Sequence, residues 1–405
     1  MSKSELIVGL DIGTTKICAV VGEPSENGGM DIVGIGTSPS TGLRKGVVVN
    51  IEQTVQSIKR ALEEAELMAG CEIRSVYAGI AGSHIKGVIA VKGGEVSPRD
   101  IERALDAAKA VAIPLDREVI HILPQEYIVD DQRGIADPMG MAGVRLEVKV
   151  HIVTGAVTSA QNIVRSCHKS GLDVSDIVLE SLASAKAVLT EEEREIGVAL
   201  IDLGGGTCDI AIFANDSIKH TGVLALGGQN LTNDIAFGLR TPMAAAEKIK
   251  IKHGAAIAEM VRPDEYIEVP SVGGREPRRL SRQVLAEICE PRMEEILTLL
   301  DQELVRSGLK NMIGAGVVLT GGTALIQGCQ ELGEQVFNLP TRIGYPRNVG
   351  GLKDMVNSPK FATAMGLLRF GAEKEGMEQK FRIRSDGNVF NSILSRMKKW
   401  FSEIS

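Results

Sequence analysis

The sequence feature that most constrains the fold is a run of three glycines between two apolar stretches, residues 198–213 (VALIDLGGGTCDIAIF). The apolar residues 198–203 predict a buried strand, and residues 210–213 predict a second strand that returns beside it. The glycines between them favour a tight turn in which no Cβ blocks a ligand. Clustered backbone N–H groups attract an anion, and the flanking Asp202 and Asp209 suit a hard cation such as Mg²⁺. The stretch predicts a phosphate-binding hairpin, although an ordinary glycine-rich hairpin shares the pattern.

A second stretch near the start of the chain repeats this plan. Residues 7–21 again contain an apolar run, a turn and a second apolar run. The residues of this turn that suit a phosphate are Asp11, Gly13, Thr14, Thr15 and Lys16. Because the two copies are about 190 residues apart, they predict two similar lobes that face one shared ligand.

Length and composition narrow the class of protein. A chain of 405 residues is too long for one core, so we expect two or more domains. The net charge of −7 gives no reason to expect nucleic-acid binding, and no apolar run is long enough to span a membrane. Residues 1–6 are polar and predict no secretory signal. The six cysteines lack C-x-x-C spacing, which favours reduced thiols over disulfides or zinc.

The order of the elements predicts an α/β protein. Strands followed by a helix over residues 52–69 are typical of the start of an α/β domain, and residues 84–163 form a compact α+β segment inserted into it. Later in the chain we expect two helices hinged near Pro291, a strand at 336–339 and a last packed helix over 361–371.

Two further groups of residues suit a ligand. Gly227 and Gly228 precede a helical run, and the first N–H groups of a helix lack partners within it, which favours an anion. Glu247 and Lys250 are three residues apart and share one face of a predicted helix.

The end of the chain has a different character. Residues 372–388 are polar and charged and predict a flexible linker, for which we set the bounds at 381–388. Residues 389–405 predict an amphipathic helix about 24 Å long. Its apolar face comprises Phe390, Ile393, Leu394, Met397, Trp400, Phe401 and Ile404. With Lys398 and Lys399 beside the opposite face, the helix suits the interface of an anionic membrane. Docking on the protein's own surface and binding to a partner's groove are the alternatives.

These motifs, in this order, resemble those of the actin-like ATPases, which include actin, the Hsp70 ATPase domain, MreB and the sugar kinases. The resemblance implies a two-lobed, ribonuclease H-like fold that binds ATP with Mg²⁺, held through water by Asp11 and Asp202. The positions that match the second phosphate loop are Gly204, Gly205, Gly206 and Thr207, and those that match the adenosine motif are Gly321, Gly322 and Thr323. Glu247 and Lys250 resemble the pair beside the adenine. Glu180 resembles the acidic residue that orients the attacking water, so the implied catalytic residues are Glu180, Asp11 and Asp202.

Within this superfamily the chain resembles the FtsA family of bacterial cell-division proteins over nearly its whole length. The likeness is carried by residues 122–127 (ILPQEY), 137–147 (DPMGMAGVRLE), 269–275 (VPSVGGR) and 290–292 (EPR). The implied subdomains are 1A at 1–83, 164–195 and 359–380, 1C at 84–163, 2A at 196–228 and 305–358, and 2B at 229–304, followed by the linker at 381–388 and the membrane-targeting helix at 389–405.

The FtsA resemblance implies a function at the membrane. Such proteins polymerise into actin-like filaments on the inner face of the cell membrane at the division site. They tether the FtsZ ring, whose C-terminal tail binds subdomain 2B, and recruit later division proteins, which we assign to subdomain 1C. We place the tail contact near Arg292 and Glu295, for which a solvated helix face is the alternative. We expect at most a slow, Mg²⁺-dependent ATPase activity.

Other members of the superfamily offer rival functions. A sugar or acetate kinase needs a catalytic base and a substrate pocket, for which the insert and the amphipathic tail have no use. A chaperone ATPase needs a peptide-binding domain, and too few residues follow Thr323 to form one. A pilus-assembly adaptor of the PilM kind shares the insert, but we do not expect it to carry the basic amphipathic end.

Overall fold

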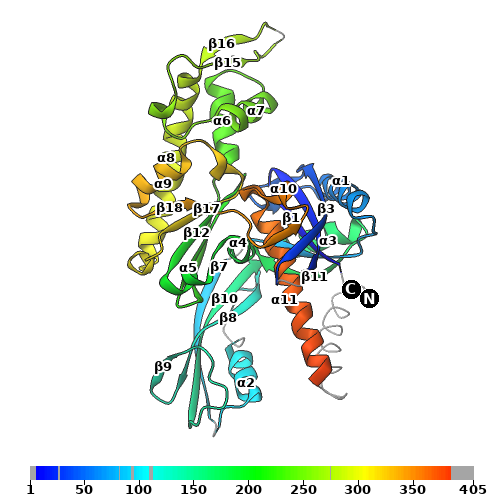
Figure 1. Ribbon diagram of the computed structural model, residues 1–405, viewed down its shortest axis with the longest axis vertical. Helices are drawn as coiled ribbons and strands as arrows, with labels where there is room; N and C mark the ends of the chain where they lie inside the picture. The colour runs from blue at the N-terminus through cyan, green and yellow to red at the C-terminus, as the bar shows by residue number, and fades with distance from the viewer. Residues whose placement is uncertain are drawn as a thin grey trace.

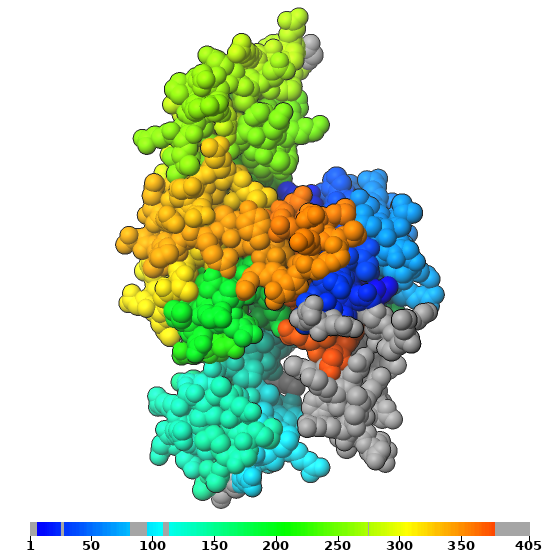
Figure 2. Space-filling model, viewed as in Figure 1, coloured from blue at the N-terminus to red at the C-terminus, as the bar shows by residue number. Residues whose placement is uncertain are grey.

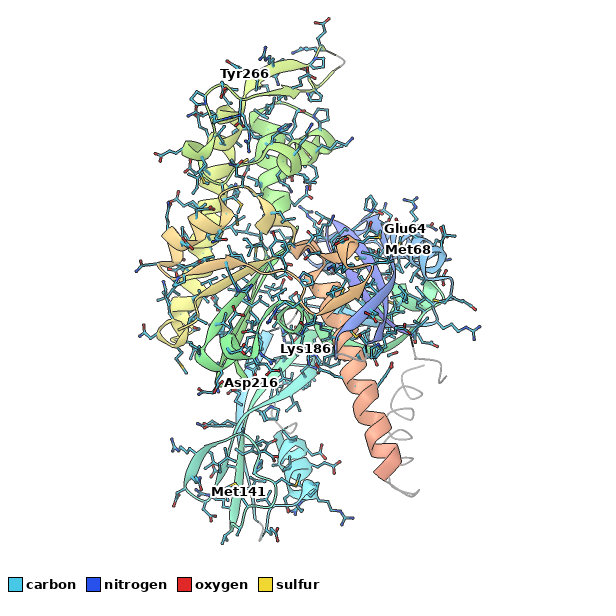
Figure 3. All side chains as sticks on the ribbon, in the orientation of Figure 1. Glu64, Met68, Met141, Lys186, Asp216 and Tyr266 are labelled. Atoms are coloured by element: carbon cyan, nitrogen blue, oxygen red, sulfur yellow. The ribbon has the colours of Figure 1, made fainter. Side chains whose placement is uncertain are left out.

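The computed structural model describes residues 6–25, 28–81, 83–92, 95–108, 113–273 and 275–384. Figure 1 shows an elongated molecule with two sheets side by side at its middle, a largely helical part at one end and a smaller sheet at the other. In Figure 3, Tyr266 lies near the first end and Met141 near the second. The predicted α/β class is therefore confirmed.

The first central sheet has six strands in the order β11-β6-β1-β2-β3-β19. Their bounds are β1 (Ile7–Ile12), β2 (Lys16–Pro24), β3 (Met30–Pro39), β6 (Ser75–Ile80), β11 (Asp173–Leu179) and β19 (Val349–Gly351). β1, β2 and β3 form an antiparallel meander, whereas β6 pairs parallel with β1 and β11 parallel with β6. The apolar run before Asp11 therefore becomes a fully buried strand near the middle of the sheet.

The second central sheet repeats this arrangement in the order β14-β13-β12-β17-β18. Its strands are β12 (Val198–Leu203), β13 (Cys208–Ala214), β14 (Ser217–Leu224), β17 (Val317–Thr320) and β18 (Thr341–Ile343). Asp11 is the fifth of six residues in β1, and Asp202 is the fifth of six in β12. In the hairpin registers Asp11 pairs with Cys18 and Asp202 pairs with Asp209. The internal repeat expected from the sequence is thus an element-by-element repeat of the fold.

Helices cover the two sheets and separate them. On the first sheet, α1 (Ile51–Ala69) begins at an Asn50 cap and ends at Gly70 in the left-handed conformation, and α3 (Val157–Lys169) packs beside it. Between the sheets lie α4 (Glu180–Val188) and α11 (Ala362–Arg384). These two helices cross so closely that a Cβ at Gly366 would lie 1.7 Å from the carbonyl oxygen of Ala183.

The predicted insert forms a sheet of its own. Its elements are β7 (Ser83–Lys92), α2 (Pro98–Ala108), β8 (Arg117–Val129), β9 (Gln132–Ile135) and β10 (Arg145–Ala156). The strands are antiparallel in the order β7-β10-β8-β9, and α2 packs against them over a separate small core. The α+β character predicted for this segment is confirmed.

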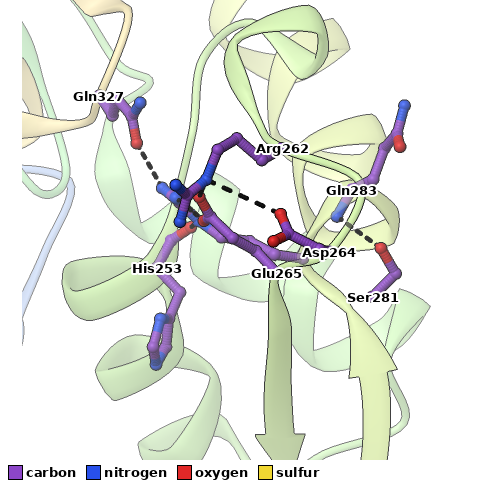
Figure 4. Close-up of polar contacts among 8 residues, drawn as sticks. His253, Arg262, Asp264, Glu265, Ser281, Gln283 and Gln327 are labelled. Carbon is purple, nitrogen blue, oxygen red and sulfur yellow. Dashed lines mark hydrogen bonds and ion pairs between the residues drawn. The ribbon is translucent and has the colours of Figure 1, made fainter.

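The opposite end of the molecule follows the second hairpin and packs on the second sheet. It comprises α6 (Gly228–Gly238), α7 (Met243–His253), β15 (Tyr266–Val269), β16 (Arg278–Ser281) and α8 (Arg282–Arg306). Figure 4 shows polar contacts at the β16–α8 corner, where Arg282 bonds to Glu265, to Gln327 and to the carbonyl oxygen of His253. One guanidinium therefore ties this end to the loop before α9 (Cys329–Phe337).

Three expected boundaries differ in the structure. α8 continues through Pro291 as one helix, because Leu285 and Cys289 before it and Met293 after it are buried on the same apolar face, which offsets the lost hydrogen bond. The strand expected at 336–339 is absent because α9 continues to Phe337.

The third boundary concerns the end of the chain. We expected the last helix to end near Gly371, but α11 continues to Arg384, which takes in the first part of the predicted linker. Lys374 pairs with Asp176 at 2.6 Å, and Glu373 pairs with Lys186, so polar residues stabilise this extension through ion pairs with the first lobe. Before the second hairpin lies a short helix, α5 (Glu191–Ile196), which begins with a capping box at Thr190.

The crossing of α4 and α11 yields a test within one helix. We expect Gly366→Ala to lower the free energy of unfolding by about 3 kcal/mol or more, because the new methyl group meets the backbone of Ala183. Gly376→Ala in the same helix meets nothing within 4 Å and should raise it by about 0.5–1 kcal/mol. Urea unfolding measures both, and equal effects would contradict the close crossing.

Candidate functional site

The turns of the two hairpins meet at a cavity of about 630 Å³ between the two sheets. Figure 2 shows the surface indented between the part of the chain near residue 250 and the part near residue 50. The predicted ligand residues that line the cavity are Asp11, Gly13, Thr14, Thr15, Lys16, Glu180, Asp202, Gly204, Gly205, Gly206, Thr207, Glu247, Lys250, Gly321, Gly322 and Thr323. Segments far apart in the sequence are therefore brought to one place.

The two turns contact one another directly. A Cβ at Gly205 would lie 2.5 Å from Thr15 Oγ1, and one at Gly206 would lie 2.4 Å from Thr14 Oγ1. Glycine is required at both positions because the backbone of the second turn packs on the threonine side chains of the first. The amide of Gly46 donates to Thr14 Oγ1 at 2.9 Å and fixes that hydroxyl.

Acidic side chains are concentrated at the floor of the cavity. Asp202 accepts hydrogen bonds at Oδ2 from Ser184 Oγ (2.6 Å) and Thr363 Oγ1 (3.1 Å), so α4 and α11 both hold it in place. Asp209 is buried, and its Oδ1 has no hydrogen-bond partner among the described residues. Glu180, the first residue of α4, lines the same space.

Burial and mutual repulsion raise the pKa values of these acids. Burial raises the pKa of Asp209 to about 7, and the nearby charge of Asp202 adds to the effect. The pKa of Glu180 is raised well above its usual value by burial and then by Asp209, Asp11 and Asp202. Burial also raises the pKa of Asp202, despite its two hydroxyl donors. Carboxylates forced together in this way favour a bound cation that neutralises them.

Lys16 supplies the positive charge closest to this floor. Its Nζ lies 3.2 Å from Asp11 Oδ2 and 5.4 Å from the centre of the Phe361 ring. Burial acts to lower the pKa of Lys16, but the charge of Asp11 outweighs it and the pKa is raised. The ammonium group therefore stays charged inside the cavity.

The Glu247 and Lys250 pair forms one wall. Lys250 is 7% exposed, and its Nζ donates to Glu247 Oε2 (2.8 Å), Thr232 Oγ1 (2.8 Å) and the carbonyl oxygen of Gly228 (3.0 Å). Thr232 also donates to Glu247. Both predicted side chains thus face the cavity from α7 in a fixed geometry.

Gly227 and Gly228 have a different place from the one that we expected. The amides of Gly228 and Gln229 donate to the carbonyl oxygens of Gly204 (3.0 Å) and Gly205 (2.7 Å). The first N–H groups of α6 are therefore engaged by the second turn, and neither glycine is among the residues that line the cavity. Their role in the described structure is to hold that turn.

The Gly321–Thr323 turn also packs on the second hairpin. Gly321 has φ +85°, and a Cβ there would lie 2.4 Å from Asp202 Oδ1. Thr323 Oγ1 donates to the carbonyl oxygen of Gly204 at 3.0 Å. The predicted adenosine motif and the second phosphate turn are therefore one connected unit.

Sequence reasoning missed several side chains that organise the site. These are Ser184, Thr232, Lys360 and Thr363, whose positions lie in helices or a short turn without a glycine signal. Among the described residues, no three histidine, cysteine or acidic side chains are placed to ligate a metal ion by themselves. The arrangement suits a cation held partly by other ligands, such as water or phosphate oxygens.

The remaining predicted residues fall elsewhere. Arg292 and Glu295 lie on α8, far along the chain from the turns, where Arg292 donates to Asp234 of α6 at 2.5 Å and pairs with Glu295. The predicted membrane-binding residues 390–404 lie outside the described residues. Within the described ranges, no helix is long and apolar enough to cross a membrane.

Comparison with known proteins places the chain among bacterial division proteins and actin-like folds. A family model described as "Cell division protein FtsA" matches residues 199–366, and one described as "SHS2 domain inserted in FTSA" matches residues 78–154. The chain is 52% identical to the cell division protein FtsA of Pseudomonas aeruginosa over 411 residues, which cover 99% of this chain and 98% of that protein.

Solved structures share the fold at low sequence identity. The PilM-PilN type IV pilus biogenesis complex matches with a TM-score of 0.64 and 18% identity, covering 90% of this chain and 98% of that one. MreB5 of Spiroplasma citri bound to ADP matches with a TM-score of 0.54 and 16% identity, covering 92% and 98%. These likenesses confirm the predicted actin-like fold.

The buried acids make stability depend on pH in a defined direction. Because the folded pKa of Asp209 is about 7 and its usual value is 3.8, its contribution is fully present below pH 4 and is lost as the pH rises towards 7. We expect Asp209→Asn to raise the free energy of unfolding at pH 8 by roughly 2–4 kcal/mol and to have little effect at pH 4.

Urea unfolding across this pH range, without nucleotide or divalent cation, makes the measurement. The exposed Asp173, for which Asp173→Asn should leave the profile unchanged, is the matched control. A profile of Asp209→Asn that parallels the wild-type profile would contradict the raised pKa.

Proposed function

Because the chain belongs to the family of the cell division protein FtsA, we propose that it is an ATP-binding, actin-like division protein that polymerises on the inner face of the cell membrane. It anchors the FtsZ ring there and recruits later division proteins. The observation that carries the proposal is the meeting of two hairpin turns, one from each lobe, over a cavity rich in buried acids. The family membership favours this function over those of a sugar kinase or a pilus-assembly adaptor.

The donor set of the cavity fits a nucleotide with Mg²⁺. The unpartnered Oδ1 of Asp209 and the raised pKa values of Asp202 and Glu180 indicate a surplus of buried negative charge that a divalent cation would offset. Asp11 and Asp202 would hold the cation through water molecules. When bound, Mg²⁺ neutralises phosphate charge, and the backbone N–H groups of both turns and Lys16 are placed to bind phosphate oxygens.

The opposite wall of the cavity fits a nucleoside. Glu247 is held by Thr232 and Lys250, and it lines the cavity together with Gly321 and Gly322. The side chain of Ile251, 74% exposed, supplies an apolar surface at the same wall. These groups would receive the adenosine while the turns receive the phosphates.

Glu180 is the group that we propose to orient a water molecule for slow ATP hydrolysis. It begins α4, and its side chain lies in contact range of Gly79, where a Cβ would be 3.0 Å from Glu180 Cγ. Burial and the neighbouring acids raise its pKa, and a bound cation would favour its ionised form.

Two lysines of α7 provide a matched test of the nucleotide site. Lys250 lines the cavity and is buried, whereas Lys248 is exposed and does not line it. We expect Lys250→Met to weaken Mg²⁺–ATP binding about 10–100-fold, because Glu247 and the Gly228 carbonyl lose their shared donor. Lys248→Met should leave the affinity unchanged.

Isothermal titration of each purified variant with Mg²⁺–ATP and with ATP in EDTA makes this measurement, with circular dichroism as the check on folding. Equal affinities of the two folded variants, or wild-type binding that does not depend on Mg²⁺, would overturn the assignment of this cavity.

The tethering part of the proposal rests on the two ends of the molecule. The amphipathic residues 389–405 would bind anionic lipid, weakly for one helix and stably when a filament carries several of them. The FtsZ tail would bind the α6–α8 end near Arg292, where Arg292, Asp234 and Glu295 form a charged surface. The insert at 84–163 would receive later division proteins.

Co-sedimentation with vesicles that contain anionic phospholipid tests the two contacts together. The full chain should bring FtsZ into the pellet, and removal of residues 389–405 should abolish sedimentation of both proteins. Arg292→Ala should keep the chain in the pellet and release FtsZ, because only the charged surface changes. Sedimentation of the truncated chain at the full-length level would contradict the tether.

A further inference from the structure

A second cavity, of about 510 Å³, lies farther along the same two helices that reach the first. α4 carries Glu180 in the first cavity and Lys186 in the second, and α11 carries Thr363 in the first and Arg369 in the second. Six residues of helix separate each pair, a rise of about 9 Å. Figure 3 shows Lys186 in the central part of the molecule, beside α11.

Basic side chains outnumber acidic ones among the residues that line this cavity. The cations that line it are Lys186, Arg194, Arg347 and Arg369. Lys186 is paired with Glu373, and Arg194 lies 3.3 Å from Asp216, so these two charges are offset within the protein. The acids at the cavity, Glu191, Glu192 and Glu373, are exposed, as is Arg347, whereas Arg369 is partly buried.

Arg347 and Arg369 form no ion pair within the described residues, although the charges of Glu192 and Glu193 act near Arg347 and that of Glu373 acts near Arg369. Arg369 Nη1 donates to the carbonyl oxygen of Lys186 at 2.7 Å, but its Nη2 is buried and has no hydrogen-bond partner among the described residues. The amide of Arg347 donates to the carbonyl oxygen of Ala187 at 3.0 Å, while its side chain has no hydrogen bond or ion pair within the described structure. Both arginines thus bond to carbonyl oxygens at the end of α4. Arg369 Nη2 and the Arg347 guanidinium take no part in these bonds.

The two guanidinium groups also act on each other. Burial lowers the pKa of Arg369, and the charge of Arg347 lowers it further. Two positive charges and an unsatisfied buried N–H group thus lie beside one cavity. An anion bound there would offset the charges and accept a hydrogen bond from that group.

We propose that Arg347 and Arg369 form a second anion-binding site, which takes the phosphate group of a small molecule in the cavity at the end of α4. The planar, forked donors of arginine match the oxygens of a phosphate, and two of them suit its charge better than that of a single carboxylate. The volume of 510 Å³ is large enough for a phosphorylated metabolite and lies within the range of small-molecule sites. The site is independent of the nucleotide cavity, with which it shares no lining residue.

Titration with pyrophosphate tests the site in the full-length chain. The nucleotide cavity is first saturated with Mg²⁺ and a non-hydrolysable ATP analogue, so that added pyrophosphate reports on other sites, and ³¹P NMR follows its binding. The wild type should bind pyrophosphate at one saturable site. Arg347→Gln should weaken this binding about tenfold or more, because one charged donor group is lost.

Three variants keep the result interpretable. Arg306→Gln removes an exposed arginine of the second lobe that does not line the cavity, and it should leave binding unchanged. Arg369→Gln should weaken binding as Arg347→Gln does, and if it fails to fold, Arg347→Gln alone decides. Arg347→Lys should recover only part of the affinity, because the charge is kept but the fork is lost.

Four outcomes would contradict a proposal made here. Wild-type binding in Arg347→Gln, or the same loss in Arg306→Gln, would overturn the site. Equal competition by acetate would overturn the assignment to phosphate. A chain that fails to bind the ATP analogue but binds pyrophosphate through Arg347 would contradict the proposed function and support this site.

Discussion

Several acidic side chains lie close together where β1 and β12 end. The structure around them has to compensate this negative charge. Asp11 and Asp202 are the penultimate residues of equivalent strands in different sheets, and Asp209 and Glu180 share their cavity. Burial raises the pKa values of Asp202, Asp209 and Glu180, which shows that negative charge is unfavourable at this site. Lys16 and hydroxyl donors offset part of it, and the remainder favours a cation and the phosphates that it accompanies.

The same convergence explains how the lobes are joined. Asp202 belongs to the second sheet, but its hydroxyl donors come from α4 and α11, the helices between the sheets. Those helices cross where Gly366 meets Ala183, and their far ends reach the basic cavity of Arg347 and Arg369. The two cavities therefore share these helices but no lining residue.

The sequence predicted the parts that local chemistry determines. Three glycines after a buried strand allow few conformations, and the repeat of that plan at Asp11 indicated two facing lobes before any packing was known. The two hairpins and the cavity residues of both turns followed from that signal, and the insert followed from the order of its strands and helices. Gly227 and Gly228 were also singled out, but their N–H groups bond to Gly204 and Gly205 because a tertiary contact satisfies the helix start.

The sequence could not predict features that depend on distant partners. Pro291 indicated a hinge, yet buried residues on both sides keep α8 continuous. Charged residues after Gly371 indicated a linker, yet Lys374 and Glu373 find ion-pair partners on the first lobe and extend α11. Ser184 and Thr363 have no motif of their own, and only the crossing of α4 and α11 brings them to Asp202.

The most direct test of the central claim is an anomalous-diffraction experiment on crystals grown with Mn²⁺ and a non-hydrolysable ATP analogue. The account predicts one manganese peak in the cavity between the ends of β1 and β12, near both Asp11 and Asp202, with the phosphates against both turns. A nucleotide bound by one lobe alone, or a manganese ion away from these two carboxylates, would contradict it.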